Sequence, residues 1–121
     1  MRDLRYRRAV PYAINEDRQL YYETFGSPPD PTLLLVNGLG ADHTAWSFQV
    51  PDVVAAGYQC IAFDNRDVGR TAESPIPAYS IREMAEDTVG LMDALGFDSA
   101  HVVGDSMGGM IAQELAIAHP G

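Results

Sequence analysis

Residues 101–121, HVVGDSMGGMIAQELAIAHPG, indicate the fold more strongly than any other stretch of the chain. They open with a short apolar run that predicts a buried strand, and Met107–His119 predicts a long helix. Between the two, Gly104–Gly108 fits the pattern G-x-S-x-G, which places a serine on a sharp strand-to-helix turn. We therefore expect a strand, a tight turn that carries Ser106, and a helix, in that order.

Ser106 is interpreted as a nucleophile. Gly104 and Gly108, two places before and after it, would let strand and helix approach without collision, and Gly109 adds a further small position. Unpaired amides and the positive end of the helix dipole favour negative charge here, so the Met107 N–H is a natural donor to an oxyanion. The alternative is a serine that only caps the helix, which is common. The glycine spacing and the preceding strand favour the nucleophile.

A second oxyanion donor is expected from residues 36–46, VNGLGADHTAW. Their first three residues end the apolar run TLLLVNG, which predicts a strand buried on both faces. The glycines that begin with Gly38 would leave the Leu39 amide free to point into a site beside Ser106. The alternatives are a simple tight turn, or a dinucleotide-binding loop, which is weaker because the third glycine of G-x-G-x-x-G is absent.

The rest of the sequence predicts an α/β domain. Residues 7–14 and 19–25 carry β-favouring residues around a turn-like NED, and indicate an antiparallel hairpin at a sheet edge. YQCIAFDN (58–65) is a second buried run. In SIREMAEDTVGLMDALG, Ser80 and Glu83 form a capping box that begins the clearest helix. Because apolar strands alternate with helices, we expect one domain with a mostly parallel sheet and helices on both faces.

Composition limits the possible partners and compartments. Hydrophobic residues make up 46% of the chain, and 17 acidic residues outweigh 8 basic ones, so nucleic acid is a poor partner. The arginine-rich N-terminus lacks the apolar run of a signal peptide, and no run approaches the roughly 18 apolar residues of a membrane span. Cys60 is the single cysteine. We therefore expect a cytoplasmic protein without a disulfide, a cysteine-type metal site or membrane contact.

Four stretches carry a resemblance to a known family. They are LLLVNGLG (33–40), AFDNRDVGRT (62–71), YSIREMAEDTVGLMDALG (79–96) and HVVGDSMGGMIAQELAIAHP (101–120). Together they resemble the N-terminal half of an α/β-hydrolase fold protein. The subgroup that the chain most resembles contains 3-oxoadipate enol-lactonases, cofactor-free haloperoxidase-like esterases and polyketide methylesterases. A serine in the elbow excludes the relatives with an aspartate nucleophile, such as haloalkane dehalogenases and most epoxide hydrolases.

The resemblance implies a serine hydrolase that acts on a small-molecule ester or lactone through an acyl-enzyme, without a cofactor. It implies Ser106 as the nucleophile, with Leu39 and Met107 as oxyanion amides. The family's Asp-x-Arg-Gly-x-Gly-x-Ser segment corresponds to residues 64–71, with Asp67 in place of glycine and threonine in place of the last serine. Because Asp67 stands where the family has glycine, the resemblance does not predict the conformation of this loop.

The sequence supplies no evident partner for the serine. In this fold the triad runs Ser, then Asp or Glu, then His along the chain. After Ser106 the only acid is Glu114 and the only histidine is His119, which a helix would carry about 20 Å from Ser106; contact with the helix C-terminus is its plainer role. His43 and His101 precede the serine and are weak candidates, because a base must come within about 3 Å of the hydroxyl.

We therefore expect the chain alone to be inactive or nearly so, because oxyanion donors without a base leave only residual catalysis of about 10³ to 10⁴ over water. We expect residues 1–121 to be a partial α/β-hydrolase domain that lacks the later strands, the lid and the triad Asp and His. The apolar strand at residues 100–105 would then be an uncovered edge that allows self-association. The alternative is a non-catalytic half-fold that binds or pairs with another polypeptide.

Overall fold

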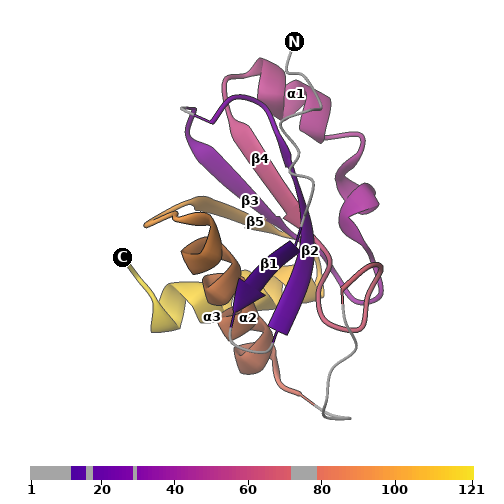
Figure 1. Cartoon of the computed structure of the whole chain (residues 1–121), viewed down its shortest axis with the longest axis vertical. Coiled ribbons are helices and arrows are strands. Elements are labelled where there is room, and N and C mark those ends of the chain that lie inside the picture. The colour runs from indigo at the N-terminus through magenta and orange to yellow at the C-terminus, as the bar shows by residue number, and fades with distance from the viewer. Residues whose placement is uncertain (1–11, 16–17, 29, 72–78) are drawn as a thin grey trace.

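The computed structural model describes residues 12–15, 18–28, 30–71 and 79–121. Within them, a five-stranded sheet of order β1-β2-β4-β3-β5 carries helices on both faces (Figure 1). The elements are β1 (Tyr12–Asn15), β2 (Arg18–Phe25), β3 (Thr32–Val36), the 3-10 helix η2 (His43–Trp46), α1 (Val50–Ala55), β4 (Gln59–Phe63), α2 (Ile81–Leu95), β5 (His101–Gly104) and α3 (Met107–Ala118).

The sheet is antiparallel at one side and parallel at the other. β1 and β2 form the predicted hairpin, and β2 also pairs antiparallel with β4. β4, β3 and β5 run parallel, with Leu34 of β3 between Ile61 and Val102 of its neighbours. The predicted α/β class with an antiparallel hairpin is therefore confirmed, although residues 7–11 of that hairpin lie outside the described part.

The two faces of the sheet carry two apolar cores, because side chains alternate along each strand. On one face, Leu34 and Phe63 are buried in a cluster that includes residues of α2 and α3. On the other face, Leu35 and Ala62 pack with Val50 of α1. The helices that cover opposite faces therefore meet the strands through alternate residues.

Cys60 lies inside the second of these cores. Its side chain is fully buried in β4, and burial raises the pKa of its thiol because a thiolate would lose its hydration there. The position is that of a small hydrophobic residue rather than of a reactive thiol.

Helix α2 has the boundaries that its sequence predicts. The Ser80 hydroxyl accepts a hydrogen bond from the Glu83 N–H at 3.1 Å, and the Glu83 carboxylate accepts one from the Ser80 N–H at 2.9 Å. Gly96 follows the helix with φ +79°, the left-handed conformation that glycine adopts readily. Both the capping box and the C-terminal glycine are confirmed. None of the described helices has the length and apolarity needed to cross a membrane.

β5 differs from the prediction of a third buried strand. Its residues alternate between exposed and half-buried, and Val103 is 40% exposed. The prediction was wrong because burial on both faces also requires covered neighbours on both sides, and among the described strands β5 pairs only with β3. Among the described strands, β5 instead matches the expectation of an uncovered edge of the sheet.

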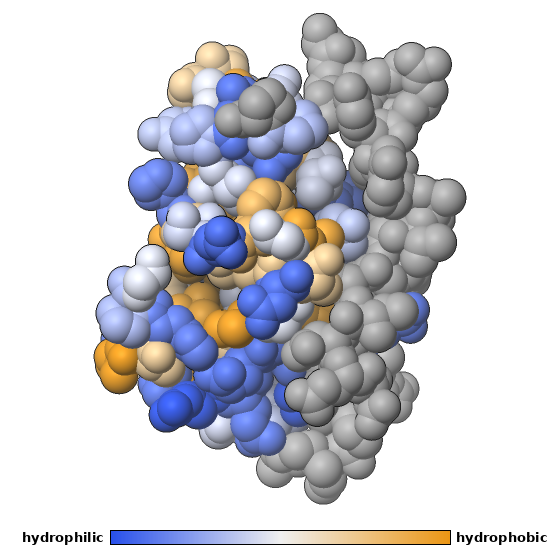
Figure 2. Space-filling model, turned by 60° about the vertical axis from the view of Figure 1, so that its left-hand side comes forward, coloured by the Kyte–Doolittle hydropathy of each residue, from blue (hydrophilic) through white to orange (hydrophobic). Residues whose placement is uncertain are grey.

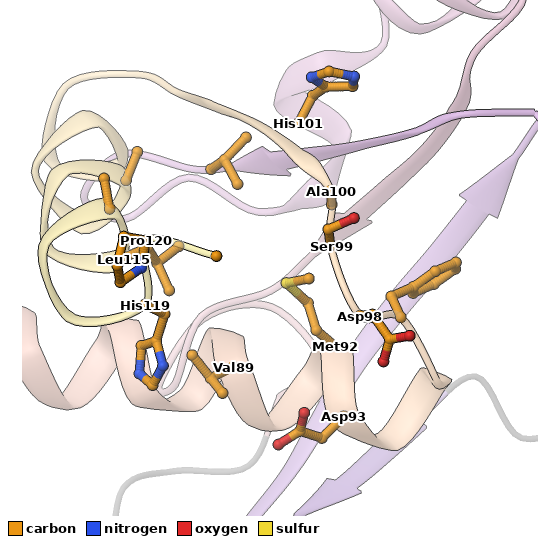
Figure 3. Close-up of a pocket in the computed structure, with 15 residues that line it drawn as sticks. Val89, Met92, Asp93, Asp98, Ser99, Ala100, His101, Leu115, His119 and Pro120 are labelled. Atoms are coloured by element: carbon orange, nitrogen blue, oxygen red, sulfur yellow. The ribbon is translucent and has the colours of Figure 1, made fainter.

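Two hollows flank β5. A cavity of about 700 Å³ lies between α2, β5 and α3, where Val89, Met92 and Leu115 line it with His101 at its rim (Figure 3). A smaller cavity of about 430 Å³, also lined by His101, lies on the α1 side of the sheet. The space-filling view shows apolar side chains exposed in a hollow between hydrophilic ones (Figure 2).

Candidate active site

Ser106 occupies the sharp turn between β5 and α3. Its backbone angles are φ +58° and ψ −118°, a conformation that is uncommon for any residue other than glycine. The side chain is exposed, and although Ser106 stands at the N-cap position, its hydroxyl makes no capping hydrogen bond. A serine that only caps the helix would make such a bond. The geometry therefore favours a hydroxyl that is available to a bound molecule.

The glycines on either side of Ser106 allow this turn to form. A Cβ at Gly104 would lie 2.1 Å from the Gly108 carbonyl oxygen, and a Cβ at Gly108 would lie 2.1 Å from the Val36 carbonyl oxygen. Neither distance is possible, so strand and helix can approach only because both residues are glycine. Gly109 differs, since a Cβ there would make an ordinary contact of 3.6 Å with Gly104. Its smallness is not needed for the turn.

The loop after β3 lies directly beside the serine turn. A Cβ at Gly38 would lie 3.3 Å from the Ser106 Cβ and 3.0 Å from the Asp105 carbonyl oxygen. In the described part of the chain, neither the Leu39 N–H nor the Met107 N–H has a hydrogen-bond acceptor. The fold thus brings together the two loops that carry the residues expected at the oxyanion position.

Asn37 fixes the start of the Leu39 loop. It is buried, and its side-chain amide donates to the Phe63 carbonyl oxygen at 2.8 Å. Its Oδ1 accepts a hydrogen bond from the Trp46 indole N–H at 2.5 Å. Asn37 therefore joins the ends of β3 and β4 to η2, a role that the sequence did not indicate for it or for Trp46.

The loop at residues 64–71 accommodates both departures from the family pattern. Asp67 takes the left-handed conformation at φ +66°, which aspartate tolerates better than most residues, and its carboxylate accepts a hydrogen bond from the Tyr79 hydroxyl at 2.8 Å. That bond raises the pKa of Tyr79, because it stabilises the protonated phenol. The Thr71 hydroxyl donates to the Asp64 carbonyl oxygen at 2.6 Å and accepts from the Tyr21 N–H at 3.0 Å. Threonine thus supplies a hydroxyl where the family has serine.

Arg66 anchors the same loop to α2. Its guanidinium donates to both carboxylate oxygens of Asp87, at 2.8 and 2.9 Å, and also lies 4.6 Å from the centre of the Tyr79 ring. These hydrogen bonds to Asp87 raise the pKa of Arg66. Only 3% of Arg66 is exposed, so the pair replaces solvent for both charges.

His43 faces two carboxylates rather than the serine. Its Nδ1 lies 2.9 Å from the Asp64 Oδ1, and its Nε2 lies 3.2 Å from the Glu23 Oε2. Both ring nitrogens are therefore engaged on the side of β2 and β4. This arrangement agrees with the expectation that His43 is a weak candidate for the catalytic base.

The other two histidines lie away from Ser106 as well. His119 contacts Glu86 of α2, with 3.0 Å between Nε2 and Oε2, so its side chain joins the two helices. His101 opens β5 at the far end of the strand and lies edge-on to Tyr58, with 6.1 Å between ring centres. Among the described residues, none pairs with Ser106 as a base.

Comparison with known proteins places this arrangement in a family. A family model described as alpha/beta hydrolase fold matches residues 31–121. The chain is 40% identical over 111 residues to the "Putative carbamate hydrolase RutD" of Azorhizobium caulinodans, covering 92% of this chain and 40% of that relative. It is 37% identical over 98 residues to epoxide hydrolase B of Mycobacterium tuberculosis, covering 78% of this chain and 28% of the relative.

Solved structures agree. The enol-lactonase from Burkholderia xenovorans LB400 superposes with a TM-score of 0.85 at 33% identity, covering 91% of this chain and 42% of that one. The chain thus spans well under half the length of the relatives that it matches. Because these relatives carry names of different activities, they share a fold rather than one substrate. The resemblance inferred from the four sequence stretches is confirmed: the chain belongs to the alpha/beta hydrolase fold family.

Proposed function

We propose that Ser106 is the nucleophile of a serine hydrolase that acts on a carboxylic ester or lactone. The observation that carries this proposal is the backbone of Ser106 itself, which holds an exposed, uncapped hydroxyl in a strained conformation at a helix N-terminus. Strain of this kind costs about 1–3 kcal/mol and is concentrated at functional sites.

The reaction follows the acyl-enzyme route. The Ser106 Oγ attacks the carbonyl carbon while a base takes the hydroxyl proton, and the backbone N–H groups of Leu39 and Met107 stabilise the oxyanion. Collapse of the tetrahedral intermediate breaks the ester C–O bond, and the base returns the proton to the departing alcohol, which stays tethered if the substrate is a lactone. Water then attacks the acyl-enzyme by the same steps and releases the acid.

We infer that the base is supplied by a group other than the histidines of this chain. All three histidines of the chain are described, and each contacts other groups away from Ser106. An unassisted serine hydroxyl is a weak nucleophile. We therefore propose that the chain alone positions the nucleophile and the oxyanion donors but hydrolyses esters only slowly.

The proposal of an ester or lactone substrate rests on the serine at position 106 and on one structurally similar protein. Haloalkane dehalogenases and most epoxide hydrolases of this family use an aspartate nucleophile, whereas position 106 holds serine. The enol-lactonase neighbour supports a cyclic ester as one substrate type.

A cytoplasmic location stays a prediction from the single cysteine.

A fluorophosphonate probe with added imidazole tests the nucleophile and the missing base together. We expect slow labelling of the isolated chain, found on Ser106 by peptide mass analysis, that imidazole accelerates roughly tenfold or more by supplying a base. Ser106→Ala should abolish labelling, whereas Ser99→Ala, which removes another exposed serine, should leave it unchanged.

Two outcomes would contradict this proposal. Labelling that stays at the Ser106→Ala level with and without imidazole would reject the nucleophile. Rapid labelling without imidazole, lost in Ser106→Ala, would instead reject the claim that the base is missing.

The open edge of β5 supports a second candidate, a chain that binds or pairs with another polypeptide or with its own copies. Unpaired strand edges beside exposed apolar surface favour such association. This candidate needs no reactive serine, so the labelling experiment separates the two.

A further inference from the structure

The Leu39 loop (residues 37–41) borders an open hollow. This hollow of about 360 Å³ lies between the loop and β5, and Trp46, Val103 and Asp105 are among the residues that line it. The Leu39 side chain points outward, and the residue is 84% exposed. A loop that borders a hollow is not held by close packing on that side. Its position therefore depends mainly on its hydrogen bonds.

Residues 38–41 of this loop form a tight turn. The Ala41 N–H donates to the Gly38 carbonyl oxygen at 3.3 Å, and Gly40 has φ +73°. A type II turn has this pattern, because its third residue takes a positive φ. The closing hydrogen bond does not use the N–H of Leu39, the second residue of the turn. The turn thus leaves this N–H available, but it does not determine how the loop is oriented relative to Ser106.

The Asn37 side chain sets that orientation, because the two ends of its amide differ. Nδ2 can only donate, and it lies 2.8 Å from the Phe63 carbonyl oxygen, which can only accept. Oδ1 can only accept, and it lies 2.5 Å from the Trp46 indole nitrogen, which can only donate. A single orientation of the amide satisfies both contacts. Asn37 is only 1% exposed, so water does not readily replace either partner.

The backbone carbonyl of Asn37 is held as well. The Asn65 side-chain amide, in the segment after β4, donates to this carbonyl oxygen at 3.4 Å. A Cβ at Gly108 would lie 2.8 Å from the same oxygen, so the carbonyl lies against the first turn of α3. Asn37 is therefore fixed relative to the turn that carries Ser106, and Leu39 follows it by two residues.

The segment has a second anchor beyond the loop. The His43 backbone N–H donates to the buried Asp64 carboxylate at 2.7 Å. This hydrogen bond does not involve Asn37, so it persists when the Asn37 side chain is changed. A change at Asn37 should therefore loosen residues 38–40 and leave η2 in place.

We propose that Asn37 is a positioning residue: its amide, fixed by Phe63 and Trp46, directs the Leu39 N–H toward the Ser106 turn. The link to catalysis rests on the proposed function, which takes the Leu39 N–H as an oxyanion donor. Asn37 itself does not contact the reacting atoms. It acts through the two residues that join it to Leu39.

Backbone order parameters of the intact 121-residue chain test this role without any reaction at Ser106. We expect the Leu39 N–H to be rigid in the wild type, with S² of about 0.85, and to fall to about 0.6 or below in Asn37→Leu. Leucine is similar in size to asparagine but neither donates nor accepts. The Met107 N–H should stay rigid in both chains, because it belongs to α3.

Two further variants separate these hydrogen bonds from general loosening. Trp46→Phe removes only the indole donor, so it should lower the Leu39 order parameter by a smaller amount. It remains a test if Asn37→Leu fails to fold. Tyr79→Phe is the matched control, because it removes another aromatic donor, the hydroxyl that donates to Asp67 at 2.8 Å. It should leave the Leu39 order parameter unchanged.

Imidazole-assisted labelling with the fluorophosphonate probe tests the link to catalysis. The probe places a phosphonyl oxygen at the position of the oxyanion. We expect Asn37→Leu to slow labelling of Ser106 about tenfold or more, because loss of one oxyanion donor typically costs about 10² to 10³ in rate. In the labelled wild type, the amide protons of Leu39 and Met107 should both move downfield. In labelled Asn37→Leu, only the Met107 proton should do so.

Several results would overturn the proposal. A Leu39 order parameter that is unchanged in both Asn37→Leu and Trp46→Phe would reject the positioning role. A Leu39 N–H that is already mobile in the wild type would reject it too, as would an equal loss of order in Tyr79→Phe. Loss of order at Leu39 without slower labelling would reject the link to catalysis.

Failure of the proposed function gives a different result. If Ser106 is not labelled in the wild type with imidazole, the hydrolase assignment fails. The order parameters of the unlabelled chain would still report whether Asn37 holds the Leu39 loop.

Discussion

The two ends of β5 lie in opposite surroundings. At its C-terminal end, the polar side chains of Asn37, Asp64 and Thr71, from the segments that follow β3 and β4, are buried and hydrogen-bonded around the loops beside Ser106. At its N-terminal end, His101 is exposed and lines two hollows, one on each face of the sheet. This chain therefore organises the loops of its candidate site with its own residues, whereas the outer edge of its sheet remains unpaired among the described strands.

The largest effect is expected from breaking the polar network. Asp87→Ala would leave the buried Arg66 guanidinium without its carboxylate partner, which typically costs about 3–5 kcal/mol of unfolding free energy. Urea denaturation measures this change. The double variant Arg66→Met/Asp87→Leu, which removes both charges, should recover much of the loss; if it were as unstable as Asp87→Ala, an uncompensated charge would not be the cause.

A smaller effect is expected at the glycines of the serine turn. Gly108→Ala would press a Cβ against the Val36 carbonyl oxygen and should cost about 1–3 kcal/mol or more, because the backbone must shift. Gly109→Ala is the matched control one residue later. It has room for the methyl group and lies in a helix, so it should leave stability unchanged or raise it by up to about 1 kcal/mol. Equal losses in both variants, in urea denaturation, would contradict the close approach described for Gly108 alone.

The smallest effect on stability is expected at the open edge. Val103→Lys should change the unfolding free energy by no more than about 0.5 kcal/mol, because the side chain is substantially exposed. If copies of the chain associate through β5, the lysine should weaken that association, since charges on edge strands oppose pairing. Sedimentation velocity over a wide concentration range measures this change.

Phe48→Lys provides the control for the edge. Phe48 is 90% exposed and lies between η2 and α1. It should therefore leave association as it is in the wild type. Equal weakening of self-association in both variants would indicate nonspecific association through exposed apolar residues, and would contradict association through the edge of β5.

Features that depend on neighbouring residues could be predicted from the sequence. The capping box of Ser80 and Glu83 is a local pattern, and so is the glycine spacing around Ser106, because both bring together atoms only a few residues apart. The order of strands and helices followed from hydrophobic runs in the same way.

Features that join distant residues could not be predicted. The contacts of His43 with Glu23 and Asp64, like the pairing of Arg66 with Asp87, join positions about twenty residues apart whose proximity depends on the completed sheet. The exposure of β5 was missed for a related reason. An apolar sequence such as HVVG shows which side chains of a strand can be buried. The elements that pack against the strand determine which of them are buried.

The single cysteine gives the molecule an internal reporter of its own opening. Cys60 is buried in β4, which is paired on both sides, and its raised pKa keeps it in the unreactive thiol form. A thiol reagent can therefore modify the chain only after the core between the sheet and α1 opens. With reagent in excess, the rate of modification measures how often this core opens under native conditions, without any denaturant or added label.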